Sequence, residues 1–115
     1  WLTDREVLPV ERVDVPPAWS HAEPRPVVSG LDNCFDGWDG RAVVDWPSRG
    51  LRLELRASPP FRHAVVYTPP DRPYFCVEPV SHANGRVAEA LLPAGATLSG
   101  TIDFRLSSSS SREIP

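Results

Sequence analysis

The sequence lacks several features that would each point to a particular class of protein. Its 12 basic and 15 acidic residues are interspersed and leave a formal net charge of -3, so no basic surface is expected that could hold a nucleic-acid backbone or an anionic membrane. No apolar stretch approaches the roughly 20 residues needed to span a bilayer. The first six residues, WLTDRE, also lack the order of a secretory signal peptide. These absences predict a cytoplasmic protein with no nucleic-acid partner and no membrane.

Cysteine is scarce as well. Only Cys34 and Cys76 occur, far apart in the sequence, which allows at most one disulfide and excludes the dense spacing of small secreted domains. We expect two reduced thiols, packed as small apolar side chains. His21, His63 and His82 are scattered, and with the cysteines they form no zinc-ligand spacing, so no metal site is predicted. Phosphate-binding loops, dinucleotide fingerprints and nucleophile elbows are also missing, and no cofactor is expected.

Proline, in contrast, is abundant, with 14 in 115 residues, where an average chain would have about 6. The prolines lie in clusters between short apolar segments, which excludes long helices and favours many turns. Residues 1–30 show neither a helical period nor an alternation, and we expect them to be an extended connection without strands. Strand patterns follow at residues 42–46, 51–57, 64–68, 74–78 and 97–106. The sequence therefore predicts an all-β fold, an antiparallel β-sandwich.

Alternating polarity indicates which side chains of two of these strands face the interior. In the 51–57 segment, the buried face is expected to hold Leu51, Leu53, Leu55 and Ala57. The 97–106 segment puts Leu98, Ile102, Phe104 and Leu106 together on one face. The 64–68 and 74–78 segments are apolar runs flanked by turn residues, as is typical of central strands covered on both faces. The Ser-rich residues 107–115 contain no core-forming pattern, and we expect them to be a tail.

Two carboxylates stand out because each lies within an otherwise apolar run. Glu78 precedes Pro79, which disfavours helical geometry and predicts an extended strand end for the glutamate. If Glu78 were partly buried against Phe75 and Tyr74, it could act as a general base. Asp32 lies in a glycine-rich segment, where we expect a loop. Each also has an ordinary interpretation, Glu78 as a solvated or ion-paired glutamate and Asp32 as a turn residue.

Two further residues could contribute to a polar binding site. Asn33, next to Asp32, can both accept and donate a hydrogen bond, which suits the recognition of hydroxyl groups. Trp38 offers a flat apolar surface of the kind that stacks on the C–H face of a sugar ring, although core packing is its commoner role. With no cofactor pattern, acid-base chemistry on a neutral polar ligand is the chemistry that these residues favour.

The amino-acid sequences of several segments resemble the C-terminal part of the aldose 1-epimerase (galactose mutarotase) family, and the resemblance extends over residues 1–106. The segments are LDNCF at 31–35, GWDG at 37–40, VYTP at 66–69, FCVEPVSH at 75–82 and LPAG at 92–95. The likeness is greatest to the bacterial aldose 1-epimerase-like proteins that share the Asp-Asn-Cys-Phe motif. The resemblance implies a galactose mutarotase-like supersandwich, of which this chain would form the C-terminal part.

The resemblance also implies roles for individual residues. Glu78 would take the proton from the anomeric hydroxyl of a free aldose, and Asp32 would hold sugar hydroxyls, with Asn33 and Trp38 as further binding residues. In the family, a histidine protonates the ring oxygen, and nothing in residues 1–30 reproduces its segment. We therefore expect a monosaccharide as substrate and an N-terminal half of the same enzyme, or a partner chain, as the source of the acid.

Two other functions remain open at this point. The same cleft could bind a sugar without converting it, as a non-catalytic carbohydrate-binding β-sandwich. The chain could also be a structural or interaction domain, which would show no saturable response to sugar.

Overall fold

The computed structural model describes residues 1–86 and 91–108, and these residues form an all-β fold with antiparallel sheets and almost no helix. The predicted fold class is confirmed at this level. The elements of the described residues are β1 (Leu2–Thr3), β2 (Pro9–Glu11), the 3-10 turn η1 (Pro17–Trp19), β3 (Asp32–Asp36), β4 (Arg41–Trp46), the 3-10 turn η2 (Pro47–Arg49), β5 (Leu51–Ala57), β6 (His63–Tyr67), β7 (Cys76–Val80) and β8 (Ile102–Ser108).

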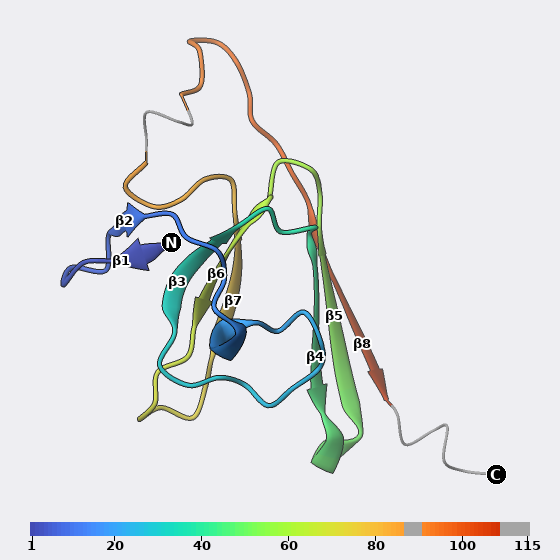
Figure 1. Ribbon diagram of the computed structural model, residues 1–115. Coiled ribbons are helices and arrows are strands. Elements are labelled where there is room, and N and C mark those ends of the chain that lie inside the picture. Colours follow the sequence, from blue (N-terminus) through green and yellow to red (C-terminus); the bar gives the residue numbers. More distant parts are fainter. Residues whose placement is uncertain (87–90, 109–115) are drawn as a thin grey trace.

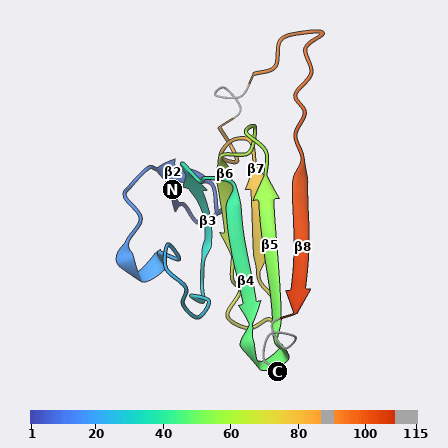
Figure 2. The same ribbon diagram turned by 90° about the vertical axis from the view of Figure 1, so that its right-hand side faces the viewer.

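The longer strands form two three-stranded sheets, β3-β6-β7 and β4-β5-β8, and each neighbouring pair is antiparallel. Figures 1 and 2 show the two sheets as separate layers, with β4-β5-β8 lying in front in Figure 2. The β4–β5 hairpin closes through η2 and Gly50, whose φ of 61° is the left-handed conformation that glycine adopts most easily. The arrangement is that of a small β-sandwich.

The two layers meet at their apolar faces. On β5 the alternation predicted for residues 51–57 is present, but only Leu55 is buried, with an exposed fraction of 6%, while its same-face neighbours are half-buried. In the other sheet, Ala64 of β6 is buried with 5% exposed. A second buried region lies on the opposite face of β3-β6-β7, where Cys34 has an exposed fraction of 2%. The core is therefore divided between the two faces of one sheet.

The prediction that residues 1–30 contain no strand is wrong. Leu2–Thr3 and Pro9–Glu11 pair as a short antiparallel hairpin beside β3 (Figure 1). The Asp4 carboxylate closes its turn by accepting hydrogen bonds from the backbone N–H groups of Glu6 (2.8 Å) and Leu8 (3.0 Å). Strands of two and three residues are too short to produce an alternation, which is why the sequence pattern gave no signal.

The strand expected at 74–78 lies two residues later, at Cys76–Val80, so Glu78 occupies the centre of β7 instead of its end. The strand continues through Pro79 because β7 is an edge strand with only β6 as its neighbour. An edge position tolerates a proline, since the missing N–H need not face the ladder. The expectation that this segment is a central strand covered on both faces is wrong, and Glu78 is exposed.

The last strand also differs from its prediction, because it spans Ile102–Ser108 and leaves residues 97–101 extended but unassigned to any strand. Its partner β5 sets this limit, since the register pairs Ala57 with Ile102 and the chain turns away after Ser58. Ser107 and Ser108 belong to β8, so the expected tail begins later than residue 107. Residues 109–115 lie outside the described residues.

Candidate functional site

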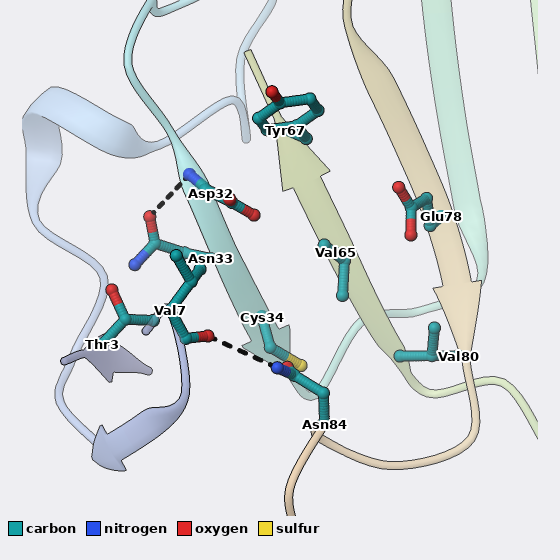
Figure 3. A pocket seen from close by; sticks show the side chains of 10 residues that line it. All are labelled: Thr3, Val7, Asp32, Asn33, Cys34, Val65, Tyr67, Glu78, Val80 and Asn84. Atoms are coloured by element: carbon teal, nitrogen blue, oxygen red, sulfur yellow. Dashed lines mark hydrogen bonds between the residues drawn. The ribbon is translucent and has the colours of Figure 1, made fainter. Parts of the chain in front are cut away.

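A hollow of about 360 Å³ lies on the face of the β3-β6-β7 sheet that the N-terminal hairpin partly covers (Figure 3). Its walls come from the sheet, from the β1–β2 hairpin and from the segment after β7. The lining residues are Thr3, Val7, Asp32, Asn33, Cys34, Val65, Tyr67, Glu78, Val80 and Asn84. The hollow therefore brings together residues that are up to 81 positions apart in the sequence, from Thr3 to Asn84.

Strand register explains how the carboxylates reach this hollow. Asp32 pairs with Tyr67, and two residues further along β3, Cys34 pairs with Val65, which in turn pairs with Glu78. Side chains two residues apart on a strand share a face, so all five side chains point to the same side of the sheet. Figure 3 shows Val65 between the two carboxylates, which come from β3 and β7. The floor of the hollow is thus apolar and two of its walls are acidic.

Asp32 is a strand residue and does not lie in a loop as the glycines around it suggested. Its side chain is half-buried, whereas Glu78 is exposed. The expected burial of Glu78 against Phe75 and Tyr74 is therefore wrong, because the strand shift turns residue 78 towards the open side of an edge strand. Neighbouring strands lie about 4.8 Å apart, so β3 and β7, on either side of β6, are about 10 Å apart.

Asn33 also lines the hollow, and its amide is already occupied by the backbone. The Nδ2 group donates to the carbonyl of Trp1 (2.9 Å), and Oδ1 accepts from the N–H of Asp32 (3.1 Å). With 8% of its surface exposed, Asn33 ties the first residue of the chain to β3. The amide keeps one N–H and one lone pair for a ligand, so its main contribution is to hold the wall in place.

The hairpin wall is held at its other end by Asn84, whose Nδ2 donates to the carbonyl of Val7 (3.4 Å). Val7 has a φ of 63°, and it is the one residue other than glycine with a positive φ among the described residues. A β-branched side chain in this conformation is strained, so the strain lies in the wall of the hollow. Backbone outliers of this kind gather at binding sites.

Tyr67 closes one end of the hollow with its ring near Asp32 (Figure 3). Loss of hydration, with smaller contributions from Tyr74 and the negative charge of Asp32, raises the pKa of Tyr67 above its ordinary value. The phenol therefore stays protonated at neutral pH and can donate a hydrogen bond into the hollow. The ring of Tyr74 lies against it, with a centroid separation of 6.3 Å.

Cys34 contributes a thiol to the floor, and only 2% of its surface is exposed. Burial, and then the negative charge of Asp36, raises the pKa of the Cys34 thiol from 9.0 to about 11. A neutral buried thiol is a poor nucleophile, so Cys34 acts as a small apolar residue. Both cysteines are free, as expected; they lie on β3 and β7, with β6 between them.

Trp38 does not line the hollow. It lies in the turn between β3 and β4, where its indole Nε1 donates to the carbonyl of Arg41 (2.9 Å) and its backbone N–H donates to the carbonyl of Arg62 (3.0 Å). These contacts join the end of one sheet to the start of the other. The structure thus gathers Asp32, Asn33 and Glu78 but leaves Trp38 apart from them.

None of the three histidines lines the hollow. His63 lies beyond its end, where Nε2 is 3.3 Å from Oδ1 of Asp36. The same carboxylate accepts from Nε1 of Trp1 (2.8 Å) and pairs with Arg12 (3.0 Å). In the portion of the chain covered by the structure, Nδ1 of His63 is buried without a hydrogen-bond partner. This cluster fixes the hairpin to β3 from the side.

Sequence reasoning missed Thr3, Val7, Val65, Val80 and Asn84 as residues of this site. They carry no chemical signal of their own, and the hairpin that supplies Thr3 and Val7 was not foreseen. Tyr67 was noted only as an aromatic residue. Knowledge of the β3–β6 register would have found it, because that register sets Tyr67 opposite Asp32.

Comparisons of the chain with protein families, with curated proteins and with solved structures found no match. Over residues 1–86 and 91–108, no group of three or more His, Cys, Asp or Glu side chains is arranged to hold a metal ion. The same residues contain no helix with the length and apolar character to cross a membrane.

Proposed function

We propose that the hollow binds a monosaccharide and serves the interconversion of the α and β anomers of a free aldose. In this proposal, Glu78 is the general base and Asp32 anchors sugar hydroxyls, within a sandwich of the galactose mutarotase-like type. The observation that carries it is the convergence of Asp32 and Glu78, 46 positions apart, on one hollow with an apolar floor. The sequence resemblance named the same two residues for these roles.

The shape and chemistry of the hollow support a small polyhydroxylated ligand. Its volume of about 360 Å³ lies at the lower end of the range typical of small-molecule sites. Val65 and Val80 offer apolar surface for C–H groups, and Asp32 and Glu78 accept hydrogen bonds from opposite sides. A six-membered sugar ring with its hydroxyl groups would bridge the two carboxylates. Neutral sugars fit better than sugar phosphates, because no lysine or arginine is among the described residues that line the hollow.

The reaction assigns a simple task to Glu78. Its carboxylate takes the proton from the anomeric hydroxyl, the C1–O5 bond breaks as the C1 carbonyl forms, and O5 receives a proton from a general acid. Rotation about the C1–C2 bond and reclosure then give the other anomer, and the protons return. Exposure of Glu78 keeps the carboxylate accessible, as a base that exchanges protons with each substrate requires.

No histidine is among the described residues that line the hollow, so these residues do not supply the histidine that would act as the general acid. We propose that it comes from a segment or a partner chain outside these 115 residues. The same observation favours a second candidate function, a carbohydrate-binding β-sandwich without catalysis. Base and acid each contribute roughly 10²- to 10⁴-fold, so a site with one of them would bind sugar while converting it slowly.

Polarimetry on freshly dissolved α-glucose and α-galactose tests the catalytic proposal. We expect the chain to accelerate mutarotation above the buffer rate, and Glu78→Gln to remove about 100-fold or more of that acceleration. Glu11→Gln, an exposed glutamate on β2, is the matched control and is expected to leave the rate unchanged. Sugar binding without any acceleration would instead favour the carbohydrate-binding function.

Calorimetric titration with the same sugars tests the anchor. Asp32→Asn is expected to weaken binding by about 10-fold or more, because a hydrogen bond to a charged group is worth roughly 1.5–3 kcal/mol. Asp14→Asn removes an exposed carboxylate outside the hollow and serves as the control. If no sugar binds to the folded chain at all, both functions fail and an interaction domain is the better description.

A further inference from the structure

The outer edge of β8 carries a surface that the sugar site does not use. β8 is an edge strand of the β4-β5-β8 sheet, and among the described strands only β5 pairs with it. Figure 2 shows β8 at the outer margin of the front layer, beyond β7 of the layer behind. Phe104 and Leu106 are each 65% exposed. A seven-residue open edge with exposed large apolar side chains is a template for pairing with another strand.

The backbone groups on this edge can be assigned from the register with β5. The carbonyl of Thr101 accepts from the N–H of Ser58 (2.9 Å), so the peptide groups of residue 101 face β5. The pairing from Ala57↔Ile102 onwards has no bulge. The peptide groups of successive residues along β8 therefore point alternately towards β5 and away from it. The N–H and C=O groups of Ile102, Phe104 and Leu106 therefore point outward, free to join a further strand.

The side chains of β8 are self-complementary about Phe104. In an antiparallel pair of two β8 strands centred on this residue, Phe104 faces its own copy, Ile102 faces Leu106, and Asp103 faces Arg105. Each opposite-charge pair occurs twice. Within residues 1–86 and 91–108, Asp103 and Arg105 form no ion pair of 4.0 Å or shorter, and the register sets them opposite Arg56 and Glu54 of β5. The two charges occupy non-hydrogen-bonded positions, where cross-strand side chains approach most closely.

The other registers that use the outward peptide groups are less favourable. Pairing centred on Ile102 sets Asp103 against Thr101, and pairing centred on Leu106 sets Arg105 against Ser107, so both lose the ion pairs. Charged residues on an edge often prevent strand addition. Here one acid and one base at symmetric positions have the opposite effect, because each meets its complement in the second copy.

We propose that two copies of this chain associate through β8, with Phe104 on the two-fold axis, to form a continuous six-stranded antiparallel sheet. Ile102, Phe104 and Leu106 of both copies extend the apolar face of the β4-β5-β8 sheet, and the Asp103–Arg105 pairs lie on its charged face. One strand edge buries less surface than a standard protein interface, so the dimer is weak and concentration-dependent. The hollow at Asp32 and Glu78 is on the other sheet and stays open.

Sedimentation velocity over a concentration series, from micromolar to millimolar, tests the dimer through charge reversal. Asp103→Arg places two arginines on each edge, and Arg105→Asp places two aspartates there. Each variant alone is expected to dissociate at least about 10-fold more readily than the natural chain, because attraction becomes repulsion at two positions. An equimolar mixture of the two variants restores every opposite-charge pair, and it is expected to associate as a heterodimer at the natural strength or above.

Two controls make the outcome decisive. Glu11→Arg changes the net charge as Asp103→Arg does, but on β2, and is expected to associate like the natural chain. Phe104→Pro removes an outward N–H while leaving the ladder with β5 complete, and is expected to abolish dimerisation with an unchanged β-sheet circular dichroism spectrum. A natural chain that stays monomeric at millimolar concentration overturns the proposal. So does a mixture of the two charge variants that associates no better than either alone.

Discussion

The two sheets of this small sandwich differ in how their faces are covered. The β4-β5-β8 sheet has one apolar face and one charged face, on which Arg52 pairs with Asp45 and Arg41 with Glu54. The β3-β6-β7 sheet instead buries side chains on both faces, because the N-terminal hairpin covers the face opposite the other sheet. The β4-β5-β8 sheet follows from the regular alternation of polar and apolar residues along its strands. The burial of the β3-β6-β7 sheet depends on contacts with residues far away in the sequence.

That difference decides where a binding site can form. On the charged face of the alternating sheet, Arg52 and Asp45 pair with each other, and Glu54 pairs with Arg41 and Arg56. On the covered sheet, the hairpin stands above the strands and leaves a hollow lined by Asp32, Glu78 and Tyr67. The regular sheet has exposed apolar side chains on its edge strand β8, whereas the covered sheet carries a hollow on one face, so the two sheets offer different kinds of surface to a partner.

The connection between the sheets is expected to be the most sensitive position. Gly40 has a φ of 86°, and a Cβ there would lie 2.6 Å from the carbonyl oxygen of Ala57. Gly40→Ala should lower the free energy of unfolding by about 3 kcal/mol or more, since left-handed strain adds to an overpacked contact. Denaturant unfolding measures this loss. Gly30→Ala, with a similar φ of 85° but open space at the Cβ, should lose less.

The inner and outer parts of the alternating sheet should respond differently to the same substitution. Leu55→Ala is expected to cost about 2–4 kcal/mol, because the side chain is 6% exposed and its removal leaves a cavity. Leu106→Ala, on the same face but 65% exposed, should cost far less. Thermal unfolding of dilute protein compares the two variants. Equal losses would show that the apolar face of β8 is covered in the monomer.

The covered sheet should lose stability in alkaline solution. The pKa of Cys34 rises from 9.0 to about 11 in the folded chain, so the unfolded thiol ionises first as the pH increases. The contribution of the Cys34 thiol to the free energy of unfolding is fully present below pH 9.0. It falls by about 2–3 kcal/mol as the pH approaches 11. Urea unfolding at several pH values measures the slope. Cys34→Ala should flatten it, and an unchanged slope would assign the loss to the tyrosines.

The smallest effect is expected on the charged face. Arg52 donates two hydrogen bonds to Asp45 (2.6 and 3.0 Å), which hold the pKa of Arg52 above its ordinary value, yet both side chains are exposed. Solvent and salt screen such a pair, so Arg52→Gln should leave the melting temperature almost unchanged. A clear drop in the melting temperature that disappears in high salt would show that this face contributes more than its exposure indicates.

The sequence predicted the strands whose side chains alternate and missed those whose limits are set by their partners. The 51–57 segment was predicted with its final bounds, because seven residues of alternation and the flanking turn residues are local signals. The strand with Glu78 was misplaced, because whether Pro79 ends a strand depends on its position at a sheet edge. The first hairpin was missed, since it depends on Asp4 closing the turn and on Trp1 contacting β3.

By itself, the sequence determined the all-β class, the free buried cysteine and the two carboxylates that the sugar proposal uses. These follow from composition, from period-two alternation and from charged residues placed among apolar ones, which are properties of neighbours along the chain. Tertiary structure alone decided that Asp32 and Glu78 face the same hollow, that Trp38 lies apart from it, and that β8 is left open. Each of these depends on strand register and sheet order, which are set by contacts between distant segments.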